Sequence, residues 1–203
     1  MAKSRILLVE GKDDKHVVWA VAQHAELPEV FEVCDKDGID ALLETLPTQL
    51  KASGLEILGI MVDADTNMQA RWQSLRDILT RAGYKVPKKP SFEGTILLME
   101  DKPTVGIWLM PDNRRTGMLE DFAAMLISDD DLLLPYARNS VAQLPERRFP
   151  DERIAKAELH TWLAWQEEPG KPIGQAITAK YLNPASEQAQ PFVNWLRTLF
   201  QIS

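Results

Sequence analysis

The sequence predicts an α/β protein with a mostly parallel central sheet flanked by helices and an antiparallel hairpin at one edge. Strand-like and helix-like patterns alternate along the first two-thirds of the chain, which is typical of βαβ units. The segment 55–62 is apolar almost throughout, as expected of a central parallel strand. Two further apolar runs, 96–99 and 105–110, flank a short turn and predict the hairpin.

Residue spacing predicts the individual elements of this core. Alternating or continuous apolar residues predict strands at 5–10, 31–34, 55–62, 96–99 and 105–110. Apolar residues at helical spacing predict helices around 17–25, 39–50, 66–82 and 119–126. Gly54 and Gly83 are expected to end the second and third of these helices, and Thr66 with Gln69 has the spacing of a capping box.

The last third of the chain reads differently. Proline-punctuated, irregular sequence is expected from 135 to 150, followed by helices at 151–166, after Gly174 and at 191–200. Five residues of this segment are too apolar to be left in water, so the segment is expected to pack on the sheet; they are Trp162, Trp165, Trp195, Leu196 and Phe200. We therefore divide the chain into a core, 1–134, and an irregular and helical extension, 135–203, which together form one structural unit.

Composition places limits on the class of protein. The 203 residues, 45% of them hydrophobic, suit one domain with a sizeable core. A single cysteine, Cys34, rules out an internal disulfide and favours a reducing, cytoplasmic setting. No apolar stretch is long enough to span a bilayer, and residues 1–5 lead into a strand without a signal-peptide core. We expect a cytoplasmic protein with no membrane partner.

The charge balance bears on partners. Twenty-three basic residues stand against 30 acidic ones, giving a net charge of −7, which is the opposite of a typical DNA-binding domain. Nucleic acid stays open as a partner, because basic residues can still gather on one face, but the net charge does not support it. A protein partner or self-association into a homo-oligomer is equally compatible with the sequence.

Acidic residues follow two of the predicted strands. Glu10 and Asp14 come at and just after the end of the first strand, and Asp63 and Asp65 follow the third. The carboxyl ends of parallel strands share one edge, where α/β proteins bind ligands. Carboxylates held close together raise one another's pKa unless a cation joins them, so the pattern predicts a divalent-cation site. The alternative for each acid is capping of the helix that follows it.

The chain resembles the Toprim domain of topoisomerases, primases and related nucleases, because it has two acidic motifs in the same order as that domain. The first is Glu10-Gly11 with Asp14, and the second is Asp63-Ala64-Asp65. Within that superfamily it is most similar to the nuclease-type Toprim domains of the overcoming lysogenization defect (OLD) proteins and to small stand-alone Toprim-like proteins of unknown function. The resemblance implies a Toprim-like fold and a magnesium site, with manganese as an alternative. Asp63 and Asp65 would be ligands, and Glu10 a ligand or the residue that handles a proton.

Nuclease-type Toprim domains carry further acids after the fourth strand and a lysine on a later helix. The resemblance therefore implies ligand roles for Asp112 and Glu120 and a role for Lys156 in stabilising negative charge in the transition state. Asp112 can equally be an ordinary turn residue, and Lys156 a solvated surface lysine. Arg114 and Arg115 are candidates for binding phosphate, or plain surface residues.

The resemblance, together with these residues, implies a magnesium-dependent phosphoryl-transfer protein, in particular a nuclease acting on phosphodiester bonds. Magnesium binds a few carboxylates and keeps positions open for water and phosphate oxygens. It can neutralise charge on the phosphoryl group and activate water near neutral pH. The alternative is a non-catalytic Toprim-like module that keeps the acidic edge to bind a metal or a protein partner, which suits the net acidity.

Overall fold

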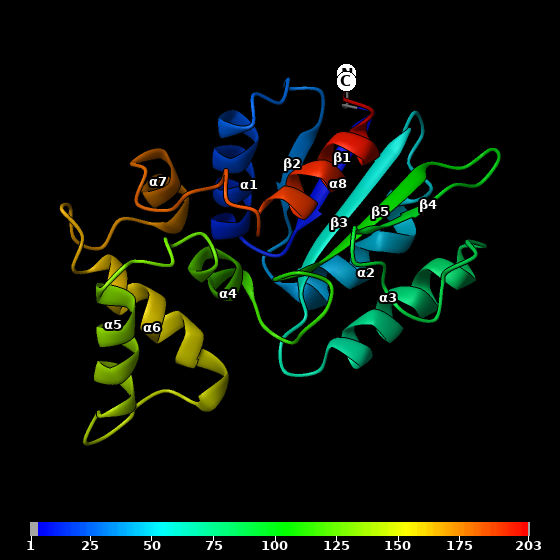
Figure 1. Cartoon of the computed structure of the whole chain (residues 1–203). Coiled ribbons are helices and arrows are strands. Elements are labelled where there is room, and N and C mark those ends of the chain that lie inside the picture. The colour runs from blue at the N-terminus through cyan, green and yellow to red at the C-terminus, as the bar shows by residue number, and fades with distance from the viewer. Residues whose placement is uncertain (1–3, 203) are drawn as a thin grey trace.

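Five strands form one sheet in the order β2-β1-β3-β5-β4 in the computed structural model, which describes residues 4–202 (Figure 1). The strands are β1 (Arg5–Val9), β2 (Glu32–Asp35), β3 (Ile57–Asp63), β4 (Thr95–Leu97) and β5 (Thr104–Met110). Neighbouring strands are parallel except β4 and β5, which are antiparallel. The predicted α/β class, with its mostly parallel sheet and antiparallel edge, is confirmed.

The order of the strands reverses at β1. The chain passes from β1 through α1 (Lys12–His24) to β2, and then crosses back through α2 (Ile39–Gln49) to β3 on the other side of β1. The carboxyl ends of β1 and β3 therefore lie side by side at a topological switch point, with Val9 opposite Met61. Ligands in open α/β sheets bind at such a point, so the fold brings the two acidic motifs to the place where a site is expected.

Alternate residues of the strands face two separate hydrophobic cores. Leu8, Ile60 and Val62 pack with α2 and α3 (Met68–Arg81), whereas Leu7 and Met61 face the opposite side. On that second side the sheet is covered by α1, α4 (Leu119–Ala124) and α8 (Gln190–Phe200) (Figure 1). Both faces of the central strands are buried, which explains why they read as continuous apolar runs.

The C-terminal helix α8 packs directly on the sheet. Gly59 and Gly106 are opposite each other on β3 and β5, and a Cβ atom added at Gly106 would lie 2.4 Å from a methyl carbon of Leu199. The missing side chains make room for the helix, whose Trp195 packs against Trp108 of β5. One core thus contains residues from both sides of the predicted boundary between 134 and 135, and that boundary falls inside α5 (Leu133–Ala142).

Two local predictions were wrong. A helix, α5, occupies part of the segment that was expected to be irregular. Pro135 does not prevent it, because this proline lies in the first turn of the helix, where no backbone donor is needed. The Asp131 carboxylate accepts hydrogen bonds from the N–H groups of Leu133 and Leu134, at 2.9 and 2.7 Å, and so caps the start of α5. Likewise α3 is capped by Asn67, whose Oδ1 accepts from the Ala70 N–H at 3.0 Å, and not by Thr66.

The remaining helices follow the predicted pattern closely. A short 3-10 turn, η1 (Asp151–Arg153), leads into helix α6 (Ile154–Leu163). A short helix, α7 (Ile173–Thr178), follows and precedes α8. Within residues 4–202, no helix combines the length and the apolarity that crossing a bilayer requires.

Candidate acidic site

Glu10 and Asp63 meet at the switch point. Glu10 directly follows β1, Asp63 is the last residue of β3, and the Asp63 N–H donates a hydrogen bond of 2.8 Å to Glu10 Oε1. The Asp63 carboxylate in turn accepts a hydrogen bond of 2.9 Å from the Leu119 N–H through Oδ1. These two bonds link β1, β3 and the start of α4, so each carboxylate is held in place by backbone from another element.

Asp14 and Glu120 add two further acids, both almost fully buried. Asp14 lies in the first turn of α1 and is 8% exposed; its Oδ2 accepts from the Gly11 N–H at 3.1 Å. Glu120 lies in the first turn of α4 and is 4% exposed; its Oε1 accepts from Lys156 Nζ at 2.6 Å. Lys156 comes from α6, so the site draws residues from five elements or their ends.

A surface hollow of about 690 Å³ contains all of these residues. It is lined by Glu10, Gly11, Lys12, Asp13, Asp14, Asp37, Gly38, Asp63, Met118, Leu119, Glu120, Arg153 and Lys156. Six of these lining residues are acidic and three are basic, which leaves the hollow with an excess of negative charge. We refer to it below as the acidic pocket.

The four central carboxylates share one arrangement. In each of Glu10, Asp14, Asp63 and Glu120, one oxygen accepts a hydrogen bond from a protein donor. For Asp14 the second oxygen, Oδ1, is fully buried and has no hydrogen-bond partner in the part of the chain that the structure describes. A buried carboxylate oxygen without a partner is costly, so this arrangement favours a further donor or a cation.

The electrostatics of the pocket reflect this crowding. Burial, followed by the charges of Asp14, Glu10 and Glu120, raises the pKa of Asp63 to about 9. Burial, followed by the charge of Glu10, raises the pKa of Asp14 to about 7. Burial also raises the pKa of Glu10, against the opposing effects of the Asp63 N–H and of Arg71. Ionisation of these acids is therefore unfavourable in the folded chain unless positive charge enters the pocket.

Lys156 supplies part of that positive charge. Partial burial lowers its pKa, but the hydrogen bond from Lys156 to Glu120 and the Glu120 charge outweigh this effect, so the pKa of Lys156 is raised. Lys156 thus stays protonated near neutral pH. It compensates Glu120 directly, which leaves Asp63, Asp14 and Glu10 as the groups most in need of a cation.

The donors suit a hard, hydrated cation such as magnesium. Their spare atoms are all carboxylate oxygens, the ligands that magnesium prefers. Within residues 4–202, however, no three His, Cys, Asp or Glu side chains already have the spacing to hold an ion among themselves. Magnesium keeps several of its waters, so it can be held by one or two of these carboxylates directly and by the others through water.

Asp65 lies outside the acidic pocket. Its backbone pairs with Gly117, with two hydrogen bonds of 2.8 Å, and its carboxylate forms an ion pair with Arg71 of α3. The charge of Asp65 still contributes to the raised pKa of Glu10 and Asp63, so the residue is near the pocket. Asp65 does not line the pocket, and its role as a metal ligand stays a prediction.

Asp112, Arg114 and Arg115 form a turn that does not line the pocket. Asp112 Oδ1 accepts hydrogen bonds from the N–H groups of Arg114 and Arg115, at 3.0 and 3.1 Å, and its other oxygen is 3.1 Å from Arg115 Nε. The Arg114 guanidinium stacks on Phe92, 3.2 Å from the ring centroid. Asp112 therefore has the contacts of an ordinary turn residue, the alternative that the sequence also allowed. Both arginines already have partners within the protein.

Four charged residues that line the pocket had not been singled out from the sequence: Lys12, Asp13, Asp37 and Arg153. Lys12 and Asp13 follow the Glu10-Gly11 motif, so their position in the chain was a usable signal. Asp37 lies after β2, and Arg153 lies far along the chain at the start of α6; no sequence spacing links them to the motif. The topology of the sheet brings Asp37 to the pocket, and the packing of α6 against α4 brings Arg153.

The fold and site define an α/β protein with an acidic pocket at its switch point. The family described as "Protein of unknown function (DUF3226)" matches residues 4–201, and the chain belongs to this family. Comparison with curated proteins gives no match. Among solved structures, the chain is similar to the C-terminal region of the OLD protein of Xanthomonas campestris pv. campestris, with a TM-score of 0.49 and 16% identity, over 100% of this chain and 98% of that one.

Proposed function

We propose that the chain is a divalent-metal-dependent phosphodiesterase, in particular a nuclease, with its active site in the acidic pocket. The observation that carries this proposal is the convergence of Glu10, Asp14, Asp63 and Glu120, in each of which one oxygen accepts a hydrogen bond from the protein, together with the buried Asp14 Oδ1, which has no partner within residues 4–202. The order of the motifs around Glu10 and Asp63, which resembles that of Toprim domains, leads to the same expectation.

In this proposal, Asp63 and Asp14 hold magnesium or manganese, directly or through water, and Glu10 is the residue that handles a proton. When bound, the metal supplies charge neutralisation on the phosphoryl oxygens and a more acidic water. The spare oxygen of Glu10 accepts a proton from the attacking water, and its raised pKa suits that role. Lys156 adds positive charge beside the phosphoryl group as negative charge builds.

The charge of the pocket makes metal and substrate binding interdependent. Six acids and three bases line it, so a phosphodiester would be repelled until cations are bound. Lys12 and Arg153, which line the same hollow, then remain to contact phosphate oxygens. We expect the affinity for a phosphodiester substrate to rise with metal concentration, and the affinity for metal to rise with substrate.

One observation favours a second function, a cation-binding module without catalysis. The Lys156 ammonium is hydrogen-bonded to Glu120, at 2.6 Å, and in this state it is directed to a protein carboxylate. A lysine held in this way stabilises the pocket but offers little to a substrate. In that case a bound cation would fix the contacts among β1, β3 and α4 without cleaving any polymer.

The test combines metal binding with cleavage. Thermal unfolding is followed during titration with magnesium and with manganese, for the wild-type chain and for Asp63→Asn, Glu10→Gln and Asp112→Asn. Each protein is then incubated with single-stranded DNA, duplex DNA and RNA. Asp112→Asn is the matched control, because it removes an acid that resembles a ligand in sequence but lies in the turn outside the pocket.

Metal-dependent cleavage by wild type and Asp112→Asn, and its loss in Asp63→Asn and Glu10→Gln, supports the nuclease. Metal-induced stabilisation that disappears in the same two variants, with no cleavage of any substrate, supports the cation-binding module. Cleavage that survives both pocket substitutions contradicts the proposal. So does metal binding that only Asp112→Asn abolishes.

A further inference from the structure

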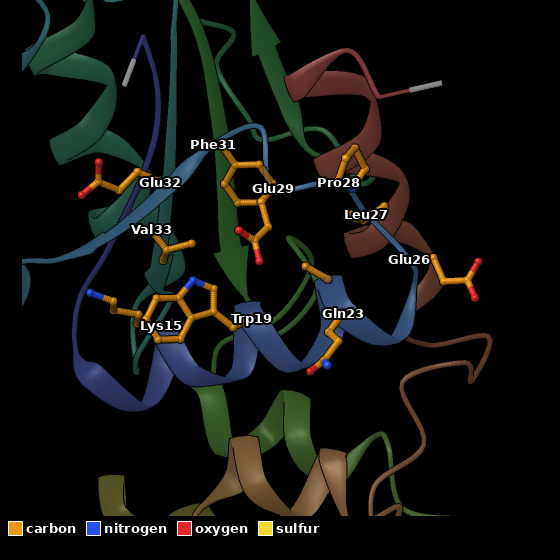
Figure 2. A pocket seen from close by; sticks show the side chains of 11 residues that line it. Lys15, Trp19, Gln23, Glu26, Leu27, Pro28, Glu29, Phe31, Glu32 and Val33 are labelled. Atoms are coloured by element: carbon orange, nitrogen blue, oxygen red, sulfur yellow. The ribbon is translucent and has the colours of Figure 1, made fainter. Parts of the chain in front are cut away.

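A second hollow lies beside the exposed edge of the sheet and shares no lining residue with the acidic pocket (Figure 2). Its volume is about 740 Å³, and it runs between α1, the loop after α1 and strand β2. Buried Leu27, Phe31 and Val33 contribute an apolar lining. We call it the β2 groove.

Trp19 of α1 stands at this groove with 48% of its surface exposed, which is unusual for so large an apolar side chain. Lys15 Nζ lies 5.0 Å from the centroid of its ring, and His16 meets it edge-on. Figure 2 shows the indole and Lys15 together on the side of α1 that faces β2. A partly exposed tryptophan beside a hollow is the kind of residue that anchors a binding partner.

Strand β2 is the outer strand of the sheet at this side. Within residues 4–202, β1 is the only strand that pairs with β2, so one edge of β2 has no strand beside it. An open edge of this kind can accept an extended peptide as an added strand, through backbone hydrogen bonds. The groove places the apolar lining and Trp19 next to that edge.

The charge of the groove selects among occupants. Three glutamates, Glu26, Glu29 and Glu32, line it, and Figure 2 shows the Glu29 carboxylate directed toward α1. Lys15, the one basic lining residue, lies 3.5 Å from Asp35 and is thereby compensated. Phosphate backbones would be repelled by this surface, and a second copy of a chain with net charge −7 would bring more negative charge to it.

We propose that the β2 groove binds an extended, basic peptide segment of a protein partner, which adds as a strand beside β2 and covers Trp19. The side chains of a strand alternate between its two faces. One set would therefore turn toward Val33 and Trp19 and should be apolar. Lysine or arginine residues in the peptide would meet Glu29 and Glu32.

The test uses a displayed library of random nonapeptides, selected on the full-length chain. Selected peptides are resynthesised with a fluorescent label, and their dissociation constants are measured by anisotropy. The variants are Trp19→Ala and the double variant Glu29→Lys/Glu32→Lys. Trp165→Ala is the matched control, because Trp165 is also exposed, at 42%, but does not line the groove.

We expect the selected peptides to be basic with apolar residues at alternate positions. Trp19→Ala and the double variant should each weaken binding roughly tenfold or more, while Trp165→Ala should leave it unchanged. The backbone nitrogens of a selected peptide form two alternating sets, and only one set can donate to β2, because a strand pairs with β2 along one edge only. N-methylation of that set should abolish binding, and N-methylation of the other set should leave it unchanged.

Several outcomes would overturn the proposal. The first is a failure to enrich any peptide, or enrichment without a preference for basic residues. The second is equal binding to wild type and Trp19→Ala. A labelled twelve-residue oligothymidylate that binds with the same dependence on Trp19 would assign the groove to nucleic acid instead. A dimer in sedimentation that Trp19→Ala dissociates would assign it to a second copy of the chain.

Discussion

At the scale of single residues, the folded chain holds Asp63 in an environment that opposes its ionisation. The residue ends a buried strand, and burial together with the charges of four other acids, Asp14, Glu10, Glu120 and Asp65, raises its pKa to about 9. Its Oδ1 also accepts a hydrogen bond from the Leu119 N–H, which positions the start of α4. Perturbed pKa values of this kind cluster at functional sites, which supports the acidic pocket as the candidate site.

Asp63→Asn should therefore stabilise the protein in the absence of metal. Asparagine keeps the acceptor oxygen for Leu119 but carries no charge, so at pH 8 in a chelator the gain should be about 1–2 kcal/mol, or roughly 2–8 °C in Tm. The measurement is thermal unfolding monitored by circular dichroism. With saturating magnesium the order should reverse, because the variant lacks a ligand. A variant that is destabilised under both conditions would contradict this interpretation.

The raised pKa values also predict how stability depends on pH. A carboxyl group whose pKa is higher in the folded chain than in the unfolded one stabilises the fold only while it is protonated. The stabilisation that protonated Asp14 and Asp63 contribute is therefore complete below pH 3.8, their ordinary pKa. It declines as the pH rises through about 7 for Asp14 and about 9 for Asp63.

We accordingly expect the Tm in a chelator to fall between pH 5 and pH 9, and the stabilisation by magnesium to grow over the same range, because metal binds the ionised form. Asp63→Asn should flatten this slope, whereas Asp112→Asn should leave it as in wild type. A metal-free Tm that rises with pH would contradict the assignment of raised pKa values to the pocket.

The sequence predicted that Glu10 and Asp63 lie at one edge of the sheet, where they meet, but it did not predict where each side chain points. Glu10 and Asp63 follow parallel strands, so their proximity follows from the topology alone. Asp65 and Asp112 occupy similar positions, yet Arg71 and a local turn capture their carboxylates. Such contacts depend on the conformation of one or two residues after the strand, which residue type and spacing do not specify. The predicted metal and catalytic roles stay predictions.

At the scale of secondary-structure elements, α8 depends on a flat surface made by two glycines. Gly106→Ala places a methyl group against Leu199 in a closely packed core and should cost about 1–3 kcal/mol. The cost should be smaller when Leu199 is also shortened to alanine, since the space is then free. Denaturant unfolding of the two single variants and the double variant gives the coupling energy. Strict additivity would mean that the two residues do not meet.

The helices were predictable to the extent that their periodicity was uninterrupted. The apolar face of α8 is regular, and its predicted start at 191 differs by one residue from the observed bound. In contrast, α5 begins with a proline in its first turn and takes its cap from Asp131, so the local sequence looks like a loop. Packing of α5 against α6 also supports the helix, and such tertiary packing is not specified by the local sequence.

At the scale of the whole molecule, the extension shares one hydrophobic core with the sheet. Trp195, Leu196, Leu199 and Phe200 of α8 are fully or almost fully buried in the core that also contains β1 and α1. A fragment ending at residue 134 would expose this apolar face. We expect it to lack cooperative thermal unfolding and near-ultraviolet circular dichroism, while the full chain shows both. A fragment that unfolds cooperatively would establish an independent core.

The hydrogen bond of 2.9 Å from the Arg5 guanidinium to the Phe200 carbonyl joins the start of β1 to the end of α8. Both lie at the amino end of the sheet, whereas the acidic pocket opens at its carboxyl end. A reporter fused at either terminus would therefore leave the mouth of the pocket clear. The same closeness makes a circular permutant feasible: a short glycine-rich tether could join the old ends while new ones are opened in an exposed loop.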